Sequence, residues 1–151
     1  DSVYAISCLM GSTIVVDTSV FIAAVRSARG RNRDILRLCL NEVVEPLIGT
    51  SLFLEMEDVI GRQDLFGHCP ISEKERRTLF HAILSVCRWT HVYYLWRPNL
   101  PDEGDNHVIE LAVAGGAEII VTNNLKHLGA GELQFPEIRI MRPNELVKEI
   151  E

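Results

Sequence analysis

The sequence has no long hydrophobic run and no clear export signal. No apolar stretch approaches the roughly 18 residues that a membrane-spanning helix needs, so we expect no contact with a membrane. Residues 1–11 carry no basic segment ahead of their apolar part, which argues against a signal peptide. We expect them to form an N-terminal extension, with Met10 as a candidate initiator.

The four cysteines form no recognisable ligand or redox motif. None lies in a C-x-x-C pair, and their spacings fit no common zinc pattern. Cys39 and Cys87 lie in apolar segments that we expect to be helical, so they are expected to be small buried side chains rather than ligands or disulfide partners. Free thiols without an export signal favour the cytoplasm as the location.

Common motifs for phosphate binding and for nucleophilic catalysis are also missing. Neither G-x-x-x-x-G-K-[ST] nor G-x-G-x-x-G follows the first apolar run, which disfavours a nucleotide-binding or phosphotransfer domain. No serine or cysteine has a histidine neighbour in a motif, so catalysis by either nucleophile lacks support. The chemistry must therefore come from other residue types.

The charge distribution is uneven. The net charge of −6 argues against a nucleic-acid partner. Yet positive side chains crowd into one short segment that contains a single acid, namely Arg26, Arg29, Arg31, Arg33 and Arg37. A metal bound among acidic residues inverts the local field, so overall acidity does not exclude a substrate that carries phosphate.

Apolar runs alternate along the chain with segments of helical periodicity. The runs predict strands over 13–16, 43–48, 92–96, 118–121 and 138–141. Helices are predicted between Asp17 and Gly30 and over 33–40, 52–60, 73–89, 107–114, 125–128 and 143–151. Strands separated by helices argue for a three-layer α/β/α sandwich with a mostly parallel central sheet. We expect a single domain over residues 12–151.

Local signals refine these boundaries. Ser72 with Glu75 three residues on predicts a capping box at the start of a helix. Thr50 or Ser51 is the expected N-cap of the helix before it. Pro46 has no amide hydrogen for a central ladder, so the second strand is expected either to run over 43–48 or to end at Glu45.

Acidic or amide side chains stand next to several of the apolar runs, and this is the most informative feature of the sequence. They are Asp17, Glu55, Asp102, Glu103, Asp105, Asn123 and Asn124. The carboxyl ends of parallel strands converge at one edge of a sheet, where ligands bind. Carboxylates brought to that edge predict a site for a hard divalent cation and metal-dependent phosphate chemistry.

Each of these residues also has a structural interpretation. Asp17 and Asp105 can each act as the N-cap of the helix that follows. His107 is more readily explained as a surface or capping residue than as a ligand. Glu55 lies beside the apolar stripe of its helix, where a carboxylate requires an arginine, a metal or a raised pKa. The arginines over 26–37 are either phosphate contacts or a solvated face.

Three segments resemble, in order and spacing, the motifs of PIN-domain nucleases. They read I-V-V-D-T-S-V-F-I, then S-L-F-L-E-M-E-D-V-I-G-R, then D-E-G-D-N-H-V-I-E-L-A-V-A-G-G-A-E-I-I-V-T-N-N-L-K-H-L. The resemblance runs from about Ser12 to the C-terminus and is closest to toxin components of bacterial toxin–antitoxin pairs. It implies a PIN-like fold for the whole domain.

In that family, acids at the corresponding places bind Mg²⁺ or Mn²⁺ and activate water to cut RNA. The resemblance assigns Asp17, Glu55 and Asp105 as catalytic metal ligands and Asp102 as a further acidic ligand. Asn124, a weaker ligand, stands where the family often has another Asp. This departure removes one charge, which is expected to weaken a second metal or leave one metal held by fewer charges.

The reaction implied by the resemblance is hydrolysis of a phosphodiester. Asn124 and Thr122 would position water or a non-bridging oxygen, and Ser19 would donate a hydrogen bond nearby. Substrate contacts, with salt-sensitive affinity, are expected from Ser19, Thr122, Asn123, Arg26, Arg29, Arg31 and Arg33.

The resemblance also implies partners. Besides RNA, these are a small antitoxin that covers the crevice and a second copy in a homodimer. Tyr93, Tyr94 and Trp96 suit a dimer surface, although sheet positions explain them more readily. The alternative is a catalytically impaired PIN-like domain that binds RNA or a protein partner without cleavage, which the neutral Asn124 favours.

Overall fold

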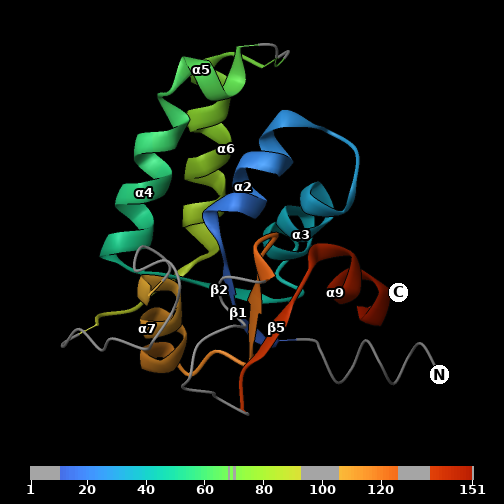
Figure 1. The fold of residues 1–151 in the computed structure, drawn as a ribbon, viewed down its shortest axis with the longest axis vertical. Coiled ribbons are helices and arrows are strands. Elements are labelled where there is room, and N and C mark those ends of the chain that lie inside the picture. Colours follow the sequence, from blue (N-terminus) through green and yellow to red (C-terminus); the bar gives the residue numbers. More distant parts are fainter. Residues whose placement is uncertain (1–10, 68, 70, 93–105, 126–136, 151) are drawn as a thin grey trace.

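The computed structural model describes residues 11–67, 69, 71–92, 106–125 and 137–150 (Figure 1). The strands in these segments are β1 (Thr13–Val16), β2 (Glu45–Ile48), β3 (Arg88–Trp89), β4 (Ile119–Val121) and β5 (Arg139–Met141). The helices are α2 (Thr18–Arg26), α3 (Arg31–Leu40), α4 (Thr50–Ile60), α5 (Gln63–Phe66), α6 (Glu73–Val86), α7 (Asn106–Gly115) and α9 (Pro143–Ile150). Within these ranges no helix has both the length and the apolar character to cross a membrane.

The strands form a parallel sheet in the order β3-β2-β1-β4-β5, with β1 at its centre. β1 pairs with β4 from Ile14 opposite Ile119 to Val16 opposite Val121. The side chains of these paired residues are at most 6% exposed, as expected for strands covered on both faces. The predicted α/β architecture is confirmed, and the five strands pair in parallel throughout.

Pro46 lies inside β2, so the alternative in which the strand ends at Glu45 is wrong and the predicted end at Ile48 is confirmed. The amide of Glu45 donates to the Ser12 carbonyl at 2.8 Å, on the side of β1. Successive residues of a strand turn their N–H groups to opposite sides, so the nitrogen of Pro46 faces the side of β3. Because β3 pairs only with Leu47 and Ile48, the missing N–H lies outside the ladder and costs no hydrogen bond.

Helices cover both faces of the sheet (Figure 1). α7 packs against β1, β2 and β4, and it lies to the left of the strands in this view. α3 and α9 pack together on the right, with α2 against α3. α4 extends above the sheet and contacts both α2 and α7. α4 is therefore placed to bring a side chain towards the end of β1.

The strand beside β2 lies earlier in the chain than predicted. α6 ends at Val86 rather than near residue 89, and Arg88–Trp89 form β3 instead. Val92 belongs to no strand, and residues 93–96, with the three aromatic residues considered for a dimer surface, lie outside the described ranges. Both residues of β3 are exposed, so this strand lacks the apolar signature on which the prediction relied.

The two predicted helix caps have different outcomes. The capping box is confirmed, because Ser72 Oγ accepts from the Glu75 amide at 3.2 Å and the Glu75 carboxylate accepts from the Ser72 amide at 3.1 Å. For α4 the prediction is wrong, since Gly49 is the N-cap and Thr50 and Ser51 are already helical.

A buried arginine joins α4, α5 and α6. Arg76 is 1% exposed. Its Nε donates to the carbonyl of Ile60, the last residue of α4, at 3.0 Å, and its Nη1 donates to the Ile71 carbonyl at 3.5 Å. The guanidinium carbon lies 4.5 Å from the centre of the Phe66 ring, and Nη2 has no partner among the residues described. Arg76 thus places positive charge at the C-terminal end of the α4 dipole.

Cys39 and Cys87 are free thiols, and of the two the prediction of a buried side chain on a helix is confirmed for Cys39 and wrong for Cys87. Cys39 in α3 has no exposed surface, whereas Cys87 follows α6 and is partly buried. Burial raises the pKa of each thiol to about 12, and the nearby Cys87 adds to the increase at Cys39. Both side chains are therefore protonated near neutral pH.

We expect Cys39 and Cys87 to resist alkylation by iodoacetamide in the native protein near neutral pH, because the thiolate is the reactive form. Unfolding in urea should raise their labelling rates to that of an unhindered cysteine. Mass spectrometry after timed labelling measures each position separately. Fast labelling of Cys39 in the native protein would show that this part of the core opens.

Candidate active site

The carboxyl ends of β1 and β4 lie side by side. Val16 pairs with Val121, and the amide of Asp17 donates to the Val121 carbonyl at 3.0 Å. Asp17 and Thr122, the first residues beyond the two strands, therefore emerge next to each other. This is the edge of a parallel sheet at which ligands commonly bind.

Two hydroxyl groups hold the carboxylate of Asp17, which is 5% exposed. Ser19 Oγ and Thr122 Oγ1 each donate to Asp17 Oδ2 at 2.8 Å. No described residue donates to the other oxygen, Oδ1. Asp17 occupies the N-cap position of α2, but its side chain makes no capping bond within the described structure. Helix capping therefore does not account for this carboxylate.

Backbone amides set the direction of both hydroxyl groups. The Asn124 amide donates to Thr122 Oγ1 at 2.9 Å, and the Asn123 amide donates to Ser19 Oγ at 3.2 Å. A hydroxyl group has a single proton, so each one that accepts from an amide turns its proton towards Asp17. The carboxylate is thereby oriented from one side only.

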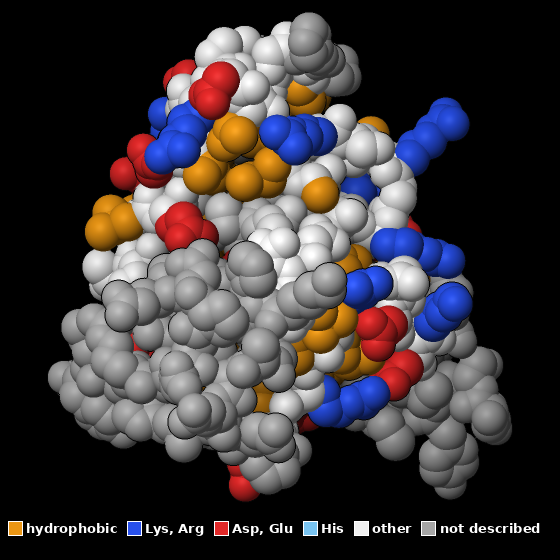
Figure 2. Space-filling model, viewed as in Figure 1, with side chains coloured by type: hydrophobic (Ala, Val, Ile, Leu, Met, Phe, Trp, Pro, Cys, Tyr) orange, Lys and Arg blue, Asp and Glu red, His pale blue; other side chains and the backbone are white. Residues whose placement is uncertain are grey.

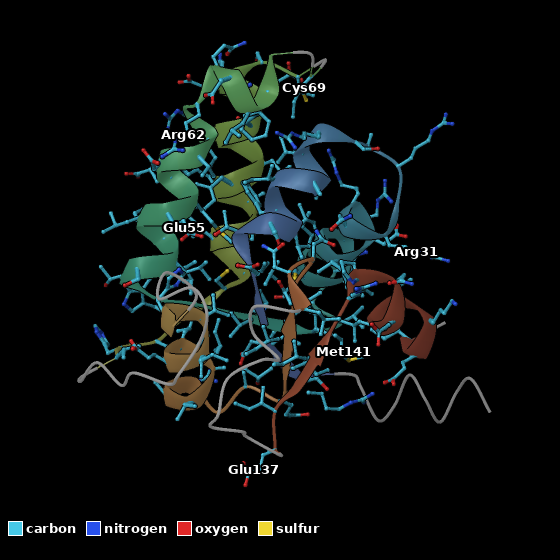
Figure 3. The ribbon with its side chains drawn as sticks, viewed as in Figure 1. Arg31, Glu55, Arg62, Cys69, Glu137 and Met141 are labelled. Carbon is cyan, nitrogen blue, oxygen red and sulfur yellow. The ribbon has the colours of Figure 1, made fainter. Side chains whose placement is uncertain are left out.

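Glu55 lies on α4, on the side turned towards α2 (Figure 3). Its carboxylate is 3.0 Å from Nε2 of His107 in α7. This hydrogen bond is the largest of the effects that set the Glu55 pKa below its usual value, while partial burial acts in the opposite direction. The partner of the Glu55 carboxylate is therefore a histidine and not the expected arginine, and the pKa of Glu55 is lowered rather than raised.

Thr18 connects the two carboxylates. Its hydroxyl is buried and has no hydrogen-bond partner at standard distance among the described groups. It nevertheless lies close enough to Glu55 to lower the pKa of that carboxyl. Since Thr18 directly follows Asp17 in the chain, Glu55 sits beside the start of α2, near the end of β1.

Asp102, Glu103 and Asp105, the remaining acids of the predicted site, lie outside the described residues, and α7 begins at Asn106. In the described ranges no three His, Cys, Asp or Glu side chains are close enough to hold a metal ion. The donors that are present, the carboxylates of Asp17 and Glu55, are the hard oxygen ligands that suit Mg²⁺ or Mn²⁺. The hydroxyl groups on Asp17 also match the way metal-binding carboxylates are usually supported.

The polar residues after β4 are neutral. Thr122 is fully buried, whereas Asn123 and Asn124 are exposed. The exposed side chain of Asn124, just beyond β4, is therefore a neutral amide. The resemblance described above has an acid at this position.

Two of the predicted RNA contacts also hold helices together. Arg26 Nε donates to the Leu65 carbonyl of α5 at 2.9 Å, and Arg33 Nε donates to the Ala24 carbonyl of α2 at 2.8 Å. Their positive charge thus lies near the C-terminal end of α2, a position that complements the helix dipole.

The other arginines of this segment lie at the surface of α3 and the turn before it. Arg31 and Arg37 both contact Asp34, at 3.5 and 2.8 Å, and Arg29 is exposed. Figure 2 shows Lys and Arg side chains gathered on the side of the molecule where α3 lies. Exposed ion pairs of this kind are weak, so they leave the guanidinium groups able to exchange partners.

Comparison with known proteins gives a family. A PIN domain model matches residues 13–126, and no curated protein sequence matches the chain. The fold is similar to that of a chain in the crystal structure of VapBC2 from Rickettsia felis bound to a DNA fragment from their promoter, with a TM-score of 0.60 and 13% identity over 86% of this chain and 98% of the other. The family match covers most of the length and includes β1, α4 and β4. The chain therefore belongs to the PIN domain family.

Proposed function

We propose that the protein is a metal-dependent endoribonuclease that hydrolyses RNA phosphodiester bonds. The observation that carries this proposal is the Asp17 carboxylate at the end of the central strand. Its Oδ2 is fixed by Ser19 and Thr122, while Oδ1 has no donor among the described residues. Membership of a nuclease family supports the same chemistry.

Asp17, Glu55 and Asp105 would hold one Mg²⁺ or Mn²⁺, with Asp102 and Asn124 as further oxygen ligands. When bound, the cation would lower the pKa of a water molecule and would compensate the charge that develops on phosphorus. The acids contribute the negative charge that makes the site selective for a divalent ion.

The surrounding residues keep these ligands in place. Thr122 and Ser19 hold Asp17 through Oδ2, and His107 holds Glu55 at 3.0 Å. Substrate contacts would come from Ser19, Thr122, Asn123, Arg26, Arg29, Arg31 and Arg33. Affinity for RNA should fall with salt, because each phosphate contact releases bound counterions.

The proposed role is that of the toxin in a toxin–antitoxin pair, which agrees with the similarity of fold to a chain of a VapBC2 complex. The free thiols favour the cytoplasm as the location. The proposed partners are an antitoxin protein that covers the carboxylate site and a second copy of the chain. The functional unit would be the single domain over residues 12–151.

A second candidate function is binding of RNA or a protein without cleavage. The exposed Asn124 favours it, because a neutral amide replaces one of the charges with which such a site would hold metal. A site with an amide in place of one carboxylate binds a divalent ion less strongly than the same site with that carboxylate.

Incubation of the purified protein with single-stranded RNA of mixed sequence tests the proposal. Cleavage is expected with Mg²⁺ or Mn²⁺ and should stop with excess EDTA, because the reaction needs the bound cation. Asp17→Asn, purified in the same way, controls for contaminating nuclease.

The outcomes separate the two functions. Cleavage that persists in EDTA, or that is equal in both proteins, would contradict the proposed nuclease. Binding of RNA and Mn²⁺ without cleavage would favour the second function, and Asn124→Asp would then show whether the missing charge is the cause.

A further inference from the structure

Two asparagine side chains meet beside Asp17. Asn123 follows β4 and Asn32 is the second residue of α3, yet Nδ2 of Asn123 donates to Oδ1 of Asn32 at 2.9 Å. The same Nδ2 donates to the Ser19 carbonyl at 3.4 Å. With an oxygen acceptor on each side, the Asn123 amide has one favourable orientation, since only its nitrogen donates. One amide group therefore ties the start of α3 to the first turn of α2.

Asn123 also acts on Asp17 through its backbone. Its N–H donates to Ser19 Oγ at 3.2 Å, and Ser19 Oγ donates to Asp17 Oδ2 at 2.8 Å. Asn123 thus holds Ser19 at both its hydroxyl and its carbonyl group. The backbone N–H of Asn123, Ser19 Oγ and Asp17 Oδ2 form a chain of hydrogen bonds that strengthen one another, and the side-chain bonds of Asn123 keep its N–H in place at the start of this chain.

We propose that Asn32 is a positioning residue for the Asp17 carboxylate. It acts through Asn123 and Ser19, keeping Ser19 on Oδ2 so that Oδ1 would remain available to a bound cation. The inference rests on the proposed function, in which Asp17 is a metal ligand.

α3 provides a firm base for this contact. Ile35 is fully buried, and Arg33 binds the Ala24 carbonyl, so the start of α3 is fixed against α2. α3 also carries Arg31, one of the proposed phosphate contacts. Asn32 therefore links the helix that would bind RNA to the edge of the sheet that would bind metal.

Two substitutions separate positioning from a purely structural role. Asn32→Ala removes the oxygen that accepts from Asn123, whereas Asn32→Asp keeps an oxygen in the same place. Asn41→Ala, at the exposed C-cap of the same helix, is the matched control. A residue that only joined two helices would change the thermal midpoint of the metal-free protein without changing its affinity for metal.

The experiment measures the Mn²⁺ dissociation constant by calorimetry, kcat and KM for RNA cleavage, and the thermal midpoint without metal. Asn32→Ala is expected to weaken Mn²⁺ binding and lower kcat by about tenfold each, the lower end of the range for residues that support a metal ligand. KM should change little. Asn32→Asp should recover most of both losses, and Asn41→Ala should match the unaltered protein.

Other results overturn the assignment. If Asn32→Ala binds Mn²⁺ and cuts RNA as the unaltered protein does, Asn32 does not position Asp17, although the nuclease function stands. If the Ala and Asp variants lose activity equally, the accepting oxygen is not the cause. If the unaltered protein neither binds Mn²⁺ nor cuts RNA, the proposed function itself fails, and the role of Asn32 fails with it.

Discussion

Asp17→Asn is expected to slow RNA cleavage about a thousandfold or more, because a metal ion stabilises the transition state by several kcal/mol and about 1.4 kcal/mol is a factor of ten in rate. The oxygen of the new amide can replace Oδ2 and still accept from Ser19 and Thr122. Its NH₂ group then replaces Oδ1, and a nitrogen that carries two protons offers no ligand to a cation. The substitution therefore removes one of the proposed metal ligands while preserving the local hydrogen bonds.

Single-turnover cleavage of labelled RNA measures this rate, and calorimetry with Mn²⁺ measures the loss of binding. Glu57→Gln is the matched control, because Glu57 is an exposed carboxylate on α4, close to Glu55 in the chain. It removes the same charge and should leave both quantities nearly unchanged. Rapid cleavage by folded Asp17→Asn would exclude Asp17 as a metal ligand.

Arg76→Ala is expected to lower the free energy of unfolding by about 3 to 5 kcal/mol, the combined effect of a large buried cavity and of carbonyl groups left without donors. The lost contacts are the bonds to the Ile60 and Ile71 carbonyls and the stacking on Phe66. For a domain of this size the thermal midpoint should fall by about 10 °C. Urea unfolding and thermal scans measure both quantities.

Neighbouring variants isolate the cause of that loss. Arg77→Ala removes an arginine at the next position, which is 43% exposed and pairs with Glu73 at 3.1 Å, so it should cost at most about 1 kcal/mol. Arg76→Met fills much of the volume without a charge and should recover part of the loss. Equal destabilisation by Arg76→Ala and Arg77→Ala would contradict the stabilising role of the buried Arg76 at the C-terminal end of α4.

Much of the fold could be predicted because local pattern and tertiary environment agree. β1 has the predicted bounds, and β4 begins one residue later than predicted, since all residues of both strands are β-branched and all except Thr13 are buried. α6 begins at its capping box as expected. β3 could not be found in this way, because its two exposed residues are strand only through pairing with β2.

The residues of the candidate site also fall into those that the local pattern predicts and those that only tertiary packing brings together. Asp17 and Thr122 were identified because they directly follow buried strands. His107, the partner of Glu55, lies 52 positions away in the sequence, and only the packing of α4 against α7 brings the two together. The position of His107 just after an acidic cluster indicated that it lies near the site, but it did not identify Glu55 as its partner. Nothing in the sequence indicated a role for Asn32, because a single amide among arginines forms no periodic pattern.

The bond from Thr122 to Asp17 has a consequence for how the chain is made. It joins residues 105 positions apart, and it depends on the parallel pairing of β1 with β4, which brings the two strand ends together. Contacts between such distant segments form late, after the cost of closing the loop has been met. While the ribosome is still adding β4, the emerging chain has an Asp17 without half of its hydroxyl support. The hydrogen bonds that orient this carboxylate are therefore complete only after synthesis has passed β4.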